Sequence, residues 1–151
     1  MLEFILILSF LPAIAFSKTF PTICLIGSAC YQGSWIDGIS STFASFQGVR
    51  YAQPPIGNLR FKPPQPYYCD EDNVIDVSEE SKVMCAQPEG LEGLYGQEDC
   101  LLLNVYVPEN VYNDPSSKVP VMVWIHGGGL VSHFLKKLFQ KTVVVFLIFI
   151  N

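Results

Sequence analysis

An apolar segment that runs directly into a glycine triplet constrains the fold of this chain more than any other feature. Residues 121–125 are Val, Met, Val, Trp and Ile, and His126, Gly127, Gly128 and Gly129 follow. Such a near-continuous apolar run is typical of a strand buried on both faces of an α/β sheet. Glycines at its end leave backbone N–H groups uncovered, and two such groups can stabilise the oxyanion of an acyl-transfer intermediate. Taken alone, the glycines fit a tight turn without a ligand equally well.

The overall charge argues against a nucleic-acid partner. The 151 residues are 50% hydrophobic, which suffices for the core of one domain, and the net charge is −5. Its nine Lys and Arg residues are scattered, apart from Lys136 and Lys137. Because phosphate binding requires clustered positive charge, we expect no nucleic-acid binding.

Residues 1–17 are predicted to be a secretory signal peptide. Residues 4–16 are almost all apolar, and Ala13, Ala15 and Ser17 supply the small residues of a cleavage site. Glu3 stands where a basic residue is usual, so a short membrane anchor is the alternative, although such a segment is too short to span a bilayer. We therefore expect a secreted, extracellular protein with no membrane span.

The cysteines fit the same compartment. Five are present, with Cys85 and Cys100 separated by 15 residues, Cys24 and Cys30 by six, and Cys69 left over. No Cys-x-x-Cys occurs and the chain has two histidines, so we expect no metal site.

Hydrophobic patterning predicts a small set of strands and little helix. Proline interrupts residues 53–66, and the acidic residues 70–82 are expected on the surface. Leu and Phe recur at helical spacing in residues 134–140, and residues 142–150 are either a buried strand or an exposed apolar tail. The expected strands are residues 22–26, 45–51, 101–107 and 119–125.

Three motifs resemble the type-B carboxylesterases. Residues 46–61 (FQGVRYAQPPIGNLRF) resemble the first signature of that family, and residues 97–108 (QEDCLLLNVYVP) resemble the second. Residues 120–129 (PVMVWIHGGG) resemble the strand and loop that form the family's oxyanion hole. The resemblance covers about residues 22–132, in the family's order and spacing. It extends to cholinesterases and to non-enzymatic adhesion relatives.

The resemblance implies the N-terminal part of an α/β-hydrolase fold, with an incomplete sheet over residues 18–151 that diverges from about residue 133. It also implies hydrolysis of small-molecule carboxylic esters by a Ser-His-Glu/Asp triad, without metal or cofactor. Gly128 and Gly129 would supply oxyanion-hole N–H groups, while His126 and Gly127 would shape the loop.

Further contacts follow from the same resemblance. It implies a disulfide between Cys85 and Cys100 and a structural ion pair between Arg60 and Glu98, which we expect to be partly buried and bidentate. Cys24 and Cys30 form a second candidate pair, and Cys69 is expected to keep a free thiol.

The triad itself is missing from these residues. No Gly-x-Ser-x-Gly occurs; the segment around Ser40 comes nearest and lacks the second glycine. His133, the last histidine, follows the glycines too closely to be the family's base. We therefore expect no ester hydrolysis by this chain alone. The alternative is a non-catalytic binding or adhesion relative of the same fold.

Overall fold

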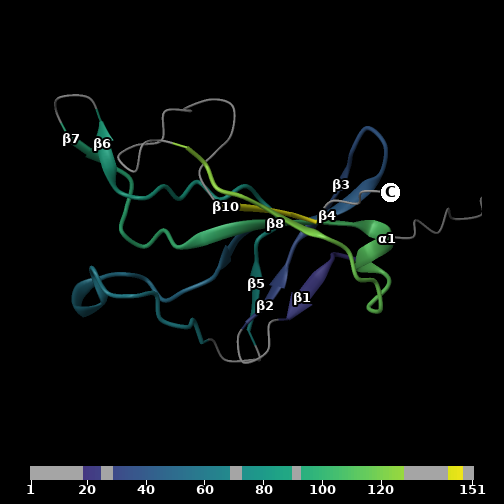
Figure 1. Ribbon diagram of the computed structural model, residues 1–151, viewed down its shortest axis with the longest axis horizontal. Helices are drawn as coiled ribbons and strands as arrows, with labels where there is room; N and C mark the ends of the chain where they lie inside the picture. The colour runs from purple at the N-terminus through teal and green to yellow at the C-terminus, as the bar shows by residue number, and fades with distance from the viewer. Residues whose placement is uncertain (1–18, 25–28, 69–72, 90–92, 128–142, 148–151) are drawn as a thin grey trace, which may run out of the picture.

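The computed structural model describes residues 19–24, 29–68, 73–89 and 93–127, together with the backbone of residues 143–147. Within these ranges the chain is mostly strands with little helix (Figure 1). The elements are β1 (Thr22–Cys24), β2 (Cys30–Gln32), β3 (Ser34–Asp37), β4 (Thr42–Arg50), the 3-10 helix η1 (Gly57–Leu59), β5 (Val74–Asp76), β6 (Gln87–Glu89), β7 (Gly93–Tyr95), β8 (Leu102–Pro108), α1 (Glu109–Tyr112), β9 (Val121–Trp124) and β10 (Val143–Leu147).

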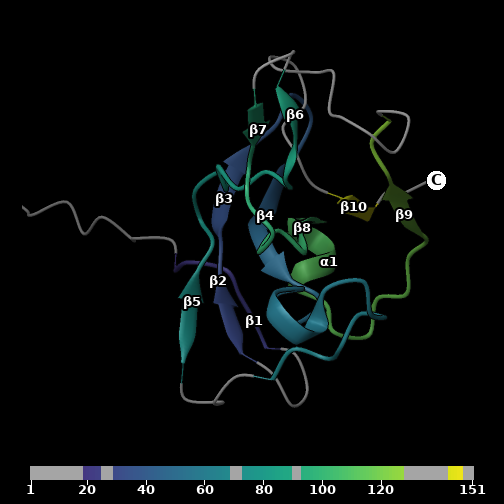
Figure 2. The ribbon, with the colours of Figure 1, turned by 90° about the vertical axis from the view of Figure 1, so that its left-hand side faces the viewer.

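The strands form three sheets. The largest has the order β3-β4-β8-β10-β9, a three-stranded sheet has the order β1-β2-β5, and β6 pairs only with β7 among the described strands. In the large sheet β8 and β10 run parallel, whereas the other neighbours are antiparallel. Figure 2 shows β5, β2 and β1 on one side of the molecule, with β9 and β10 on the other.

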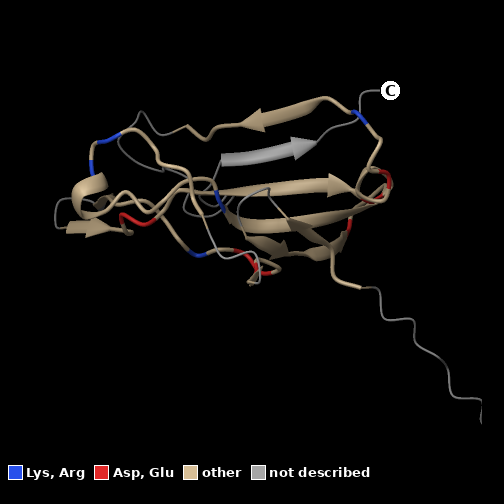
Figure 3. Ribbon diagram, turned by 90° about the horizontal axis from the view of Figure 1, so that it is seen from below, with Lys and Arg blue, Asp and Glu red and all other residues tan. Residues whose placement is uncertain are grey.

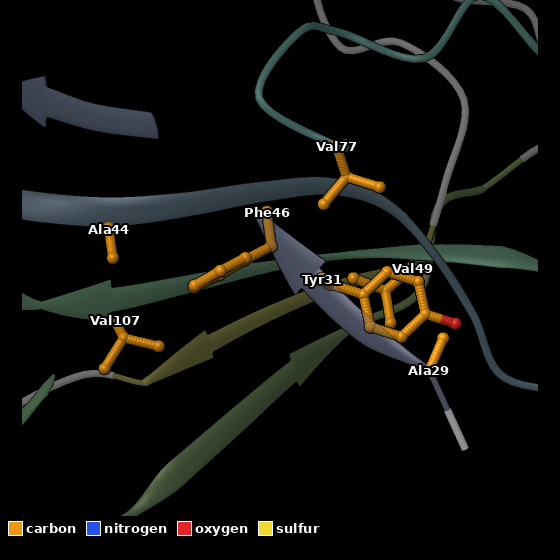
Figure 4. Packing of buried hydrophobic residues seen from close by; sticks show 7 residues of the cluster. All are labelled: Ala29, Tyr31, Ala44, Phe46, Val49, Val77 and Val107. Carbon is orange, nitrogen blue, oxygen red and sulfur yellow. The ribbon is translucent and has the colours of Figure 1, made fainter. Parts of the chain in front are cut away.

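The core lies where the two larger sheets face each other. Ala44 and Phe46 lie two positions apart on β4, so they share one face, and both are fully buried. Tyr31 of β2 is 1% exposed. Figure 4 shows these side chains gathered between β2 and β4. The other buried members of the cluster are Ala29, Val49, Val77 and Val107.

A β-bulge keeps β4 in contact with this core over its whole length. The register against β8 shifts between Gln47 and Val49, and Gly48 between them has a φ of +100°. Because side chains alternate between faces, the extra residue returns Val49 to the buried face. The buried Asn104 of β8 accepts a hydrogen bond of 2.9 Å from the Gly48 N–H, which satisfies the group that the bulge displaces.

Gly33 allows the two sheets to approach closely. It connects β2 to β3, and a Cβ there would lie 2.3 Å from the Ser45 carbonyl oxygen and 2.7 Å from the Phe46 ring. The absence of a side chain therefore brings the backbone of this connection onto β4.

Tyr112 at the end of α1 ties the first strand to the large sheet. Its hydroxyl accepts a hydrogen bond from the Thr22 N–H at 2.7 Å and donates to the Thr22 carbonyl at 2.9 Å. Its ring packs edge-on against Trp35, with centroids 5.2 Å apart.

The four strand predictions are confirmed in position, with shifted ends. The segment expected at residues 45–51 begins earlier, at Thr42, and β1 is shorter than expected. A strand is also present within residues 142–150, as β10. The prediction that residues 70–82 lie on the surface is wrong at Val77, which follows β5 and is 6% exposed. The predicted signal peptide, Cys69 and the predicted helix at residues 134–140 lie outside the described residues.

We expect Phe46→Ala to lower the free energy of unfolding by about 3–5 kcal/mol, since it leaves a cavity between the sheets. Phe61, which is 104% exposed, is the matched control, and Phe61→Ala should change stability by less than about 0.5 kcal/mol. Urea denaturation of both variants measures the difference. Equal losses would contradict the assignment of Phe46 to the core.

Candidate oxyanion loop and its supports

The predicted oxyanion loop begins where β9 ends. His126 Nδ1 and the Gly127 carbonyl oxygen lie 2.8 Å apart. Because a carbonyl oxygen can only accept, Nδ1 carries the proton and donates it. His126 is therefore hydrogen-bonded within the loop that it begins. Gly128 and Gly129, the expected oxyanion donors, lie outside the described residues.

Gly127 is not required by the packing around it. Among the described residues, a Cβ at this position would meet no atom within 4 Å, and the φ of Gly127 lies outside the left-handed range. Gly33, by contrast, would clash with Ser45 and Phe46 if it carried a side chain.

The strand that carries the loop is more exposed than its sequence predicts. Val121 is 59% exposed, Val123 56% and Ile125 71%. Among the described strands β9 pairs only with β10, and it does so antiparallel. The prediction of burial on both faces is therefore wrong within the described part of the chain, where β9 has a neighbouring strand on one side only.

The disulfide implied for Cys85 and Cys100 is present. It closes a loop that contains β6 and β7. The backbone of Gln97 forms hydrogen bonds with the residues before and after Cys85. The Gln97 N–H donates to Met84 at 2.8 Å, and the Ala86 N–H donates to Gln97 at 3.0 Å. A second disulfide joins Cys24 to Cys30, which face each other across β1 and β2.

Arg60 and Glu98 form the expected ion pair, but in a more exposed setting. The Arg60 side chain is 55% exposed, so the expectation of partial burial is wrong for it, whereas Glu98, with a side chain 40% exposed, is half-buried as expected. Arg60 Nε donates to Glu98 Oε1 at 2.6 Å, and Nη2 donates to the same oxygen. Both guanidinium donors thus converge on a single carboxylate oxygen.

Sequence reasoning missed the better-formed pair, which joins Arg50 to Asp99. Arg50 Nη1 donates to Asp99 Oδ1 at 2.5 Å and Nη2 donates to Oδ2 at 2.8 Å, a two-oxygen geometry. The side chains are 23% and 34% exposed, and the Tyr67 ring lies 5.5 Å from Arg50 Cζ. The hydrogen bond to Asp99 raises the pKa of the Arg50 guanidinium above its usual value. The sequence offered one hint of this pair: an arginine stands near the end of one predicted strand, and two acidic residues, 98 and 99, stand just before another.

A cleft of about 290 Å³ lies between β2, β4 and β5, beside this pair. Its polar and charged lining residues are Tyr31, Gln47, Arg50, Asp76, Glu79 and Ser81. The guanidinium already binds Asp99, and the Ser81 hydroxyl accepts a 3.3 Å hydrogen bond from the Val83 N–H. Among the described residues that line the cleft there is no histidine, so they offer no serine–histidine pair for acyl transfer.

A model of the carboxylesterase family matches residues 32–146. The chain belongs to the carboxylesterase family. The match continues beyond residue 133, where the motifs alone suggested divergence, and it includes most of β10.

Individual carboxylesterases are similar over shorter stretches. A "Carboxylic ester hydrolase" of Bombus ignitus is 45% identical over 92 residues, covering 57% of this chain and 16% of that protein. "Carboxylesterase 1C" of Mus musculus is 39% identical over 110 residues, covering 64% of this chain and 19% of that protein. "Liver carboxylesterase B-1" of Rattus norvegicus is 38% identical over the same number of residues. This chain thus spans less than a fifth of the length of these carboxylesterases.

Two absences concern only the described part of the chain. No group of three or more His, Cys, Asp and Glu side chains there could hold a metal ion. No helix among the same residues is long and apolar enough to cross a membrane.

We expect the double variant Cys85→Ser/Cys100→Ser to lose about 3 kcal/mol of unfolding free energy, because a 15-residue loop is released in the unfolded chain. The six-residue Cys24–Cys30 loop is the control, and its double serine variant should lose about 2 kcal/mol. Thermal or urea unfolding of both variants compares them. A non-reducing peptide map that joins Cys85 to Cys69 would overturn the pairing.

We expect Asp99→Asn to lower the free energy of unfolding by about 1–2 kcal/mol, since it weakens a half-buried, two-oxygen pair with Arg50. Glu98→Gln is the matched control and should cost less, because its pair is more exposed to solvent. Urea titrations at low and at high salt measure both variants. A larger loss for Glu98→Gln would reverse the ranking of the two pairs.

Proposed function

We propose that this chain is the N-terminal part of a secreted serine carboxylic-ester hydrolase with the α/β-hydrolase fold. In this proposal Gly128 and Gly129 donate their backbone N–H groups to the oxyanion, and His126 and Gly127 hold the loop. The substrates of the complete enzyme are small-molecule carboxylic esters, and the reaction needs neither metal nor cofactor.

The course of the chain at the end of β9 carries the proposal. His126 is hydrogen-bonded to the Gly127 carbonyl, which orients that peptide group, and no atom of the described residues would contact a Cβ at Gly127. A glycine that packing does not require leaves the backbone accessible to a ligand. Accessible backbone N–H groups are what an acyl-transfer site needs where negative charge develops on oxygen.

The relatives support the substrate class. The similar proteins are named as a carboxylic ester hydrolase in Bombus ignitus and as carboxylesterases in Mus musculus and Rattus norvegicus. The second candidate, a binding protein of the same fold that does not hydrolyse esters, rests on the missing triad.

The chain alone should not hydrolyse esters. Removing a triad serine or histidine costs a well-studied protease about 10⁶ in turnover. Catalysis that survives such a loss depends on an oxyanion hole and on bound substrate. Here the serine elbow and the downstream base are both missing from the sequence.

The purified chain is expected to show no p-nitrophenyl ester hydrolysis above buffer, and no covalent labelling by a fluorescent organophosphate. Both follow from the absence of an activated serine. A full-length serine carboxylesterase is the positive control for the two assays. Hydrolysis that copurifies with the chain and stops on labelling would contradict the assignment.

The ester hydrolase and the binding protein differ downstream. The transcript is read beyond the codon for Gly129, and a Gly-x-Ser-x-Gly followed later by a histidine supports the hydrolase. If such a product exists, Gly128→Ala should lower kcat about 10²-fold, because the methyl group displaces the bound carbonyl. Gly93→Ala, also in open space, is the matched control and should leave kcat unchanged.

A further inference from the structure

We draw no further inference here: the strongest candidate, the cleft between β2, β4 and β5, whose acidic residues are among those drawn in red in Figure 3, carries nothing, because its Arg50 already binds Asp99 and nothing else among the described lining residues shows what Asp76 and Glu79 would bind.

Discussion

The antiparallel ladder between β4 and β8 is the interaction on which the rest of the structure depends. β4 is the longest strand, and seven of its residues pair with β8. The core face of β4 packs on Tyr31 of the smaller sheet. β8 pairs with β10 on its other side and is followed directly by α1. The bulge at Gly48 keeps Val49 on the core face of β4 while the pairing with β8 continues. Without the extra residue Val49 would point away from the core.

Three consecutive residues fix the entrance to this ladder. Glu98 binds Arg60, Asp99 binds Arg50, and Cys100 is bonded to Cys85. The first two bonds join the two signature motifs, and the third anchors the loop that lies between them. The two motifs therefore form one structural unit, because the two arginines of the first motif pair with the two acidic residues that precede β8. Arg50 supplies the more buried contact because it is the last residue of β4 and pairs with Leu102, the first residue of β8.

Local patterning predicts the parts of this fold that depend on one segment. The strand at residues 101–107 was predictable from its run of Leu and Val, and β9 from its β-branched residues. The strands β2, β5, β6 and β7 have only three residues each, which is too short for an alternating pattern to reveal them. The prediction of burial was wrong for β9, because the exposure of a strand depends on the elements that pack against it and not on its own sequence. Arg50–Asp99 was missed because it depends on the register of β4 against β8.

The exposure of β9 also bears on catalysis, independently of the missing triad. An oxyanion hole works only when its donors are held within roughly 0.5 Å of their productive positions. Here the loop continues from a strand that is paired on one side, and Ile125, which immediately precedes His126, is 71% exposed. The hydrogen bond from His126 to Gly127 orders one peptide group but cannot anchor the strand beneath it. In the proposed enzyme, a rigid pair of oxyanion donors therefore requires a further strand on the side of β9 where the described residues place none. A strand at that position would lie next to the loop and would determine how firmly the proposed N–H donors are held.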